Sequence, residues 1–128
     1  MKLLLDTHLL LWAAAGDPRL PAEAVRLLED PDSEPMFSVA SLWEVAIKQG
    51  LGRNDFRADA GVLRRGLLDN GYLELPILAA HVLPVAGLPD HHKDPFDRLL
   101  VAQAQSEGIT LLTVDPQLAR YPGPVRLL

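Results

Sequence analysis

Short apolar runs alternate along the chain with longer segments in which apolar residues recur at helical spacing. The short runs predict strands, and they cover residues 2–5, 36–39, 72–75, 109–114 and 125–128. The longer segments predict helices at 9–15, 21–29, 41–49, 58–69 and 95–107. We also expect one short helix and a loop within 77–93 and another short helix after Asp115-Pro116. Gly, Pro, Asn or Asp follows most of these segments, as is typical of turns.

The order of these predicted elements indicates an α/β fold. Strands and helices alternate, and most strand segments are continuously apolar and rich in branched side chains. Such strands are typical of a mostly parallel sheet that helices cover on both faces. The chain has 128 residues, of which 48% are hydrophobic, enough for one hydrophobic core. We therefore expect a single domain over residues 1–128.

Composition narrows the classes of function. The chain has no cysteine, which excludes disulfide scaffolds, thiolate zinc sites and cysteine nucleophiles. Its net charge of -5 argues against binding nucleic acid through bulk positive charge, so any such contact must be local or mediated by cations. Asp6 comes too early for a signal peptide, and no apolar run approaches the ~20 residues of a membrane span. We expect a cytoplasmic protein without membrane contact.

Two acids follow predicted strands directly. Asp6 ends the strand at 2–5, and Asp115 ends the strand at 109–114. In an open α/β sheet, ligands bind outside the carboxyl ends of the strands, so both carboxylates should face one crevice if the two strands are neighbours. The alternative is that each acid only caps a helix, since Asp is favoured at that position.

Two further acids lie on predicted helices whose other residues are mainly apolar. Glu44 forms a polar stripe with Ser41 and Lys48, which either lines a cleft or is a solvated face with an ordinary ion pair. Asp97 lies in the first turn of the helix that begins after Asp94-Pro95, and it shares a face with apolar residues. A charge on a core-facing stripe points to a function.

Several carboxylates in one crevice require positive charge, because each pair repels by about 4 kcal/mol at ~4 Å in a medium of effective dielectric ~20. Lys48 and Arg98 can offset part of this repulsion. An all-oxygen cluster suits Mg²⁺ or Mn²⁺, which can activate water and neutralise a phosphodiester. His91 and His92 could suggest zinc, but adjacent histidines point apart in most backbones, so we do not expect them to bind metal.

Four segments together resemble PIN-domain ribonucleases, specifically the VapC-type toxins of toxin-antitoxin systems. The segments are residues 3–12 (LLLDTHLLLW), 38–48 (SVASLWEVAIK), 92–104 (HKDPFDRLLVAQA) and 111–115 (LLTVD). The resemblance implies a PIN-like three-layer fold, Mg²⁺ or Mn²⁺, and endonucleolytic cleavage of RNA. It also implies that the catalytic and metal-binding residues are Asp6, Glu44, Asp97 and Asp115. Thr7, Ser41 and Thr113 are expected to orient these acids or water, and Asp94 is expected to be an auxiliary acid.

The resemblance further implies a partner, a VapB-type antitoxin. The acidic pocket in a chain of net charge -5 leads to the hypothesis that this partner places a basic side chain near Asp6 and Asp97. We also expect a homodimer. Lys48, Arg53 and Arg98 are the candidate RNA contacts, and residues 48–65 carry five basic and two acidic side chains. Two other functions stay open, a receiver domain that is phosphorylated on aspartate and a catalytically silent binding module.

Overall fold

The structure is a computed structural model, and it describes residues 1–52 and 59–128. Its strands form one sheet in the order β3-β2-β1-β4-β5, and every neighbouring pair is parallel. The strands are β1 (Lys2–Leu5), β2 (Glu34–Ser38), β3 (Leu73–Leu75), β4 (Thr110–Thr113) and β5 (Val125–Leu127). The predicted α/β fold with a parallel sheet is confirmed.

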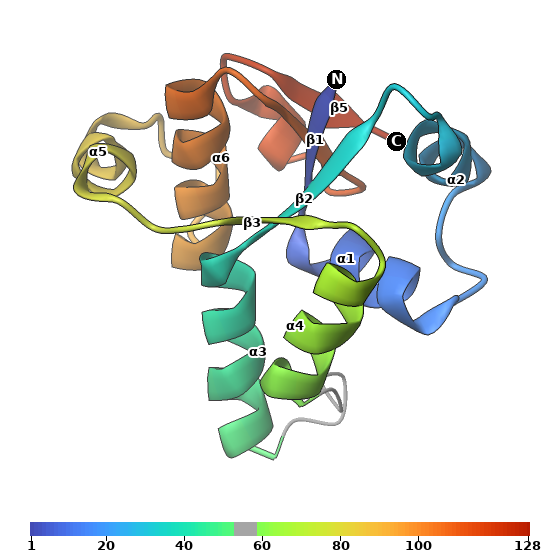
Figure 1. The fold of residues 1–128 in the computed structure, drawn as a ribbon. Coiled ribbons are helices and arrows are strands. Elements are labelled where there is room, and N and C mark those ends of the chain that lie inside the picture. The colour runs from blue at the N-terminus through green and yellow to red at the C-terminus, as the bar shows by residue number, and fades with distance from the viewer. Residues whose placement is uncertain (53–58) are drawn as a thin grey trace.

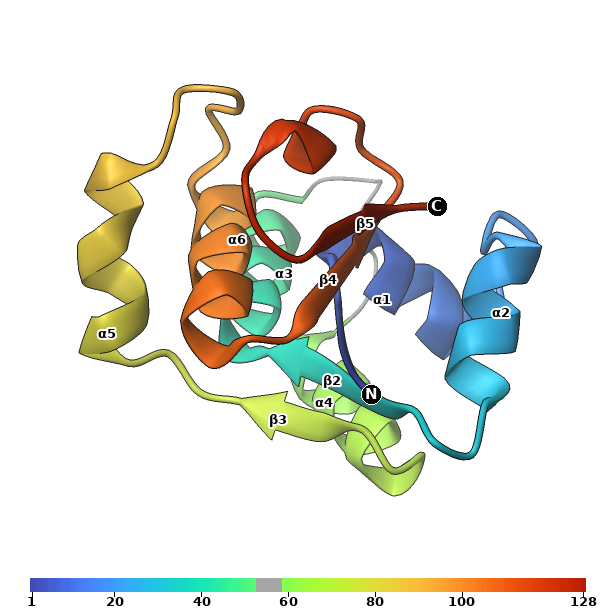
Figure 2. The same ribbon diagram turned by 90° about the horizontal axis from the view of Figure 1, so that it is seen from above.

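Helices lie on both sides of this sheet (Figure 2). The α-helices are α1 (Thr7–Ala15), α2 (Ala22–Glu29), α3 (Val39–Gly50), α4 (Ala60–Asp69), α5 (Ala79–Val82) and α6 (Pro95–Glu107). Two 3₁₀ helices, η1 (Leu83–Gly87) and η2 (Leu118–Arg120), complete the described elements. Helices α5 and α6 cover one face, and α1 and α2 cover the other, which gives three layers.

Both faces of the sheet are buried because neighbouring strand residues enter different cores. Leu4 packs with residues of α6, whereas Leu3 and Leu5 pack with residues of α1 and α4. On β4, Leu111 likewise packs in the core with Leu4, and Leu112 packs in the core with Leu3 and Leu5. Burial on both faces explains why these strands are continuously apolar in sequence.

Some element boundaries differ from the sequence prediction, and side-chain caps explain the clearest case. We predicted a strand to residue 39, but β2 ends at Ser38, whose hydroxyl accepts a hydrogen bond from the Ala40 amide at 3.0 Å. Ser38 is thereby the N-cap of α3, which begins at Val39. The predicted start of α4 at residue 58 lies outside the described residues.

The carboxyl ends of β1, β2 and β4 meet at one edge of the sheet, and α1 and α3 begin there (Figure 1). β1 and β4 are neighbours, with Leu5 beside Leu112, as the crevice prediction required. None of the described helices is long and apolar enough to cross a membrane.

Candidate functional site

Asp6 is both a helix cap and a member of the site. It follows β1 with only 4% of its surface exposed, and its Oδ1 accepts the Leu9 amide at 2.9 Å, which caps α1. Its Oδ2 accepts the Thr113 hydroxyl at 2.5 Å, and Thr113 Oγ1 in turn accepts the Asp115 amide at 2.9 Å. Thr113 therefore connects the two acids that end β1 and β4.

Glu44 lies on α3 and faces the interior, so the solvated-face alternative is wrong. Its exposed fraction is 3%, and Ser41, one turn earlier, is fully buried. Glu44 Oε2 pairs with Lys48 Nζ at 2.6 Å, while Oε1 is buried without a hydrogen-bond partner in the described part of the chain. The Thr7 hydroxyl donates to Ser41 Oγ at 2.9 Å and thus joins the start of α1 to α3.

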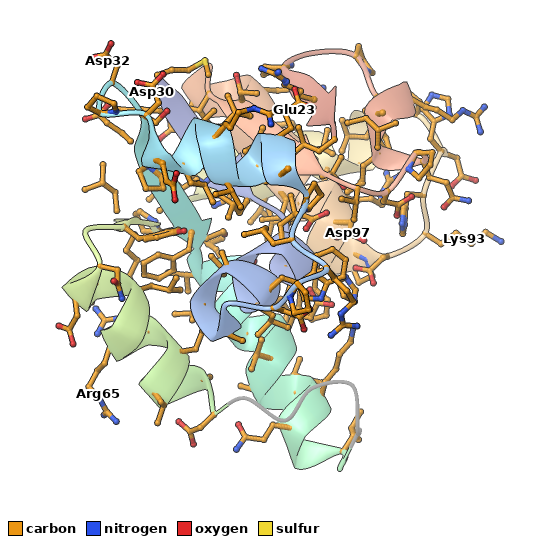
Figure 3. All side chains as sticks on the ribbon, turned by 90° about the vertical axis from the view of Figure 1, so that its right-hand side faces the viewer. Glu23, Asp30, Asp32, Arg65, Lys93 and Asp97 are labelled. Carbon is orange, nitrogen blue, oxygen red and sulfur yellow. The ribbon has the colours of Figure 1, made fainter. Side chains whose placement is uncertain are left out.

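Asp97 occupies the first turn of α6 and points toward the other acids. Asp94 caps this helix by accepting the amides of Phe96 at 2.8 Å and Asp97 at 3.1 Å. Burial and, in decreasing order, the negative charges of Asp94, Glu44, Asp6 and Asp115 together raise the pKa of Asp97 to about 8. Figure 3 shows Asp97 at the end of α6 beside the start of α1, whereas Lys93 points outward.

These electrostatic interactions show that the four predicted acids converge. Asp6 also has a raised pKa, mainly because burial disfavours its charged form, although hydrogen bonds from Thr113 and Leu9 oppose the effect. The charge of Asp115 adds to the increase. The four acids therefore interact electrostatically at the carboxyl edge of the sheet, where Asp6 and Glu44 are buried and Asp97 and Asp115 are partly exposed.

His92 is a member of the cluster that the sequence analysis missed. Its Nε2 lies 2.9 Å from Asp115 Oδ2 and 3.4 Å from Asp97 Oδ2. Ligand atoms of His92, Asp97 and Asp115 all lie within 4.8 Å of one another. His91 indeed points elsewhere, since its ring packs on Tyr121 with centroids 5.1 Å apart. The sequence analysis evaluated His91 and His92 only as a pair of zinc ligands, so it did not identify His92 alone as a neighbour of the acids.

The residues present fit a hard divalent cation. Glu44 Oε1 is a buried acceptor with no hydrogen-bond partner among the described residues, and the neighbouring charges that raise the pKa of Asp97 are all carboxylates. Burying such a group without a partner is unfavourable, and Mg²⁺ and Mn²⁺ prefer oxygen ligands. Asp6, Glu44, Asp97 and Asp115 are the residues that would hold the ion.

The candidate RNA contacts have different positions. Lys48 pairs with Glu44 at the edge of the acidic cluster. Arg98 is instead directed into the loop before α6, where Nη2 donates to the Val85 carbonyl at 2.9 Å and Nη1 donates to the Tyr121 hydroxyl at 3.1 Å. Sequence reasoning missed this structural role of Arg98. Arg53 lies outside the described residues.

Comparison with known proteins identifies the fold. The model of the PIN domain matches residues 3–124. The chain belongs to the PIN-domain family. PIN domains are generally metal-dependent nucleases. No curated protein matches the sequence.

Solved structures agree on the PIN fold. A chain of VapBC2 from Rickettsia felis, crystallised with a DNA fragment from the promoter, aligns with a TM-score of 0.72 and 16% identity, covering 100% of this chain and 99% of that one. A chain of VapBC from Salmonella typhimurium, also bound to DNA, aligns with a TM-score of 0.67 and 14% identity, and the alignment covers 98% of this chain and 97% of that one. A chain of VapBC-5 from Mycobacterium tuberculosis aligns with a TM-score of 0.63 and 20% identity, and the alignment covers 99% of this chain and 97% of that one.

Proposed function

We propose that this PIN domain is a divalent-metal-dependent endoribonuclease of the VapC type, the toxin of a toxin-antitoxin pair. The observation that carries the proposal is the acidic cluster, in which Glu44 Oε1 is buried without a hydrogen-bond partner among the described residues and the pKa of Asp97 is raised by burial and by the neighbouring acids. Perturbed carboxyl groups gathered in a crevice are typical of catalytic sites. The VapBC complexes among the structural neighbours support the toxin assignment.

Each acid has a role in this mechanism. Asp6, Asp97 and Asp115 hold Mg²⁺ or Mn²⁺, and Glu44 either holds the ion or orients the attacking water. When bound, the ion neutralises charge on the phosphodiester and makes water a better nucleophile. Thr113 fixes the Asp6 carboxylate through its hydroxyl, and Thr7 and Ser41 keep α1 and α3 in register around the acids.

Lys48 supplies a positive charge at the edge of the acidic cluster. Its ammonium group lies 2.6 Å from Glu44 Oε2, and its side chain is 18% exposed. It can therefore balance Glu44 before RNA arrives and contact a phosphate oxygen afterwards. Arg53 is proposed to extend this contact along the RNA backbone.

A VapB-type antitoxin is the proposed protein partner, and a groove along α1 and α4 is its proposed docking site. The groove holds about 880 Å³ and is lined by apolar residues such as Leu11, Val62 and Leu67, with Glu29 and Asp59 among its polar groups. A segment with apolar and basic side chains complements this lining. Helix α1 has nine residues and is therefore ~14 Å long, and it leads from the groove to Asp6 at its N-cap.

The antitoxin proposal predicts separate anchoring and inhibition. The apolar segment would occupy the groove, and a basic side chain at its end would pair with the carboxylates and displace the cation. Removing that basic side chain should weaken inhibition more than binding, as measured by RNA cleavage and by calorimetry. Equal inhibition by the altered partner, or the absence of a small protein that co-purifies, would contradict this regulation.

A second copy of the chain is proposed to cover an exposed apolar stripe on α3. The stripe consists of Trp43 and Ile47 on α3 and of Leu51, which caps the end of this helix; the three residues are 54%, 39% and 71% exposed. These residues follow one another at intervals of four, so they lie along one face of the helix. Phe96 of α6 extends the stripe, because its ring packs edge-on against Trp43 with the ring centroids 4.9 Å apart. Contiguous exposed apolar surface is typical of protein interfaces.

Cleavage of RNA by the purified chain tests the nuclease proposal. A mixed pool of single-stranded and structured RNA should be cut with Mg²⁺ or Mn²⁺ and left intact with EDTA. The receiver alternative predicts instead a stable phosphoaspartate and no cleavage. The silent-module alternative predicts neither reaction under any metal condition.

A further inference from the structure

We propose that His92 is a positioning residue of the metal centre, a hydrogen-bond donor that orients the Asp115 and Asp97 carboxylates, and that Tyr121 and Arg98 hold it in place. This inference rests on the proposed nuclease function and adds a residue to the same site. Its basis is the hydrogen-bond geometry around the imidazole and around its main chain.

The contact to Nδ1 fixes which ring nitrogen can donate. The Asp94 amide points at His92 Nδ1 at 3.0 Å, and a backbone N–H can only donate. Nδ1 is therefore the acceptor nitrogen, and the ring hydrogen is on Nε2. Nε2 then donates to Asp115 Oδ2 at 2.9 Å and faces Asp97 Oδ2 at 3.4 Å. In this orientation His92 is a donor to the metal-binding acids and is not itself a ligand.

The Asp115 carboxylate is held from two sides. Its Oδ1 accepts the Gln117 amide at 2.9 Å, while its Oδ2 accepts from His92. Each carboxylate oxygen has a second lone pair, which stays available for a cation. Two donors on one carboxylate fix its plane, as outer hydrogen bonds commonly do for metal ligands. His92 is thus placed to present Asp115 in the binding orientation before an ion arrives.

The main chain of His92 is itself anchored to a buried tyrosine. The His92 amide donates to the Tyr121 hydroxyl at 2.9 Å, and that hydroxyl lies 3.3 Å from the His92 carbonyl oxygen. Only 3% of the surface of Tyr121 is exposed. The hydroxyl therefore reaches both polar groups of the His92 backbone from a rigid position in the core.

Arg98 completes this anchor from α6. Its Nη1 donates to the Tyr121 hydroxyl at 3.1 Å and to the His92 carbonyl at 3.3 Å. Its guanidinium also donates to carbonyls of the preceding loop, at Val85, Leu88 and Pro89. Because Arg98 directly follows Asp97 in sequence, the same helical turn supplies an acid of the site and the group that holds the loop carrying His92.

Mn²⁺ affinity of the full-length chain tests the inference without using cleavage. We expect His92→Leu to weaken Mn²⁺ binding ~10–100-fold, the range typical when a hydrogen-bond partner of a metal ligand is lost. His92→Gln keeps an N–H near the position of Nε2, so it should restore affinity to within about threefold of the wild type. Calorimetry and the Mn²⁺ electron paramagnetic resonance signal report binding, and circular dichroism confirms folding.

Matched variants separate the outcomes. His91→Leu makes the same change at the neighbouring histidine, which packs on Tyr121, and it should bind Mn²⁺ like the wild type. Unchanged affinity in folded His92→Leu overturns the inference, and so does an equal loss in His92→Gln, which would make the imidazole a ligand. If His92→Leu does not fold, Tyr121→Phe decides, since removing one hydroxyl should weaken binding and an unchanged affinity overturns the anchor. Failure of the wild type to bind Mn²⁺ refutes the proposed function itself.

Discussion

Asp97 shows at the scale of one residue what gathering acids does to a carboxyl group. Its position in the first turn of α6 is favourable for a negative charge, yet burial and four neighbouring acids raise its pKa to about 8. The sequence indicates the helix start and the acid, since both follow from the local Asp94-Pro95-Phe96-Asp97 pattern. The perturbation itself depends on residues distant in sequence, such as Asp6 and Glu44, and only the fold reveals it.

The first prediction concerns stability and pH without metal. The pKa of Asp97 is about 8 in the folded protein and near its ordinary value of 3.8 when the chain is unfolded, so the native state binds this proton more tightly. Its contribution to stability is complete below about pH 4 and is lost as pH rises to about 8. In EDTA, the melting temperature should fall between pH 5 and pH 8.5 more in the wild type than in Asp97→Asn. An equal fall of the melting temperature with pH in the two proteins would contradict the raised pKa of Asp97.

The second prediction concerns Thr113, which joins Asp6 and Asp115. Thr113→Val removes the hydroxyl but keeps the shape, and it leaves the Asp115 amide and one Asp6 oxygen without that partner. Denaturant unfolding should show a loss of about 1–3 kcal/mol. Thr110→Val on the same strand is the control, because Thr110 is only partly buried at the opposite end of β4. A similar loss in both variants would indicate that Thr113 acts only through strand packing.

At the scale of elements, the sequence predicts what local pattern determines. β1, β4 and α6 were predicted within a residue or two, because burial on both faces makes strands continuously apolar and Asp94-Pro95 marks a helix start. Residues 77–93 were predicted only as a short helix and a loop. Their conformation depends on the distant Arg98 and Tyr121, whose hydrogen bonds to this loop leave no periodic pattern in sequence.

The third prediction tests this tertiary control of the loop. Arg98→Met keeps an unbranched apolar chain but removes the guanidinium that bonds the carbonyls of residues 85–92. Hydrogen exchange should become faster across 85–94, and unfolding should show a loss of about 1.5–3 kcal/mol. Arg120→Met is the control: it changes an exposed arginine of η2 and should leave the hydrogen exchange of 85–94 and the free energy of unfolding unchanged. Unaltered hydrogen exchange across 85–94 in Arg98→Met would mean that the conformation of the loop does not depend on Arg98.

At the scale of the whole molecule, the proposed chemistry and the proposed assembly use different surfaces. The acids lie at the carboxyl edge of the sheet, the apolar groove lies between α1 and α4, and the apolar stripe lies on α3. The site itself is built from β1, α3, α6 and β4, which are far apart in sequence. Parallel strand order brings them together, so the family resemblance could indicate the acids but not their mutual geometry.

The fourth prediction tests the proposed dimer. Ile47→Asp places a charge in the middle of the exposed stripe on α3 and should shift the protein from dimer to monomer in light scattering after size exclusion. Leu83→Asp is the control, since Leu83 is 77% exposed on η1 and lies outside the stripe. A wild-type protein that is monomeric at micromolar concentration would contradict the dimer without affecting the nuclease proposal.

The rate of RNA cleavage by single carboxamide variants tests the central claim most directly. With Mg²⁺ present, Asp6→Asn, Glu44→Gln, Asp97→Asn and Asp115→Asn should each lower the cleavage rate by more than ~100-fold, because each removes a charge that the cation requires. Asp69→Asn, at an exposed position of α4, should cleave like the wild type. Near wild-type turnover in any three of the four variants would contradict the account, because the acidic cluster would then be structural.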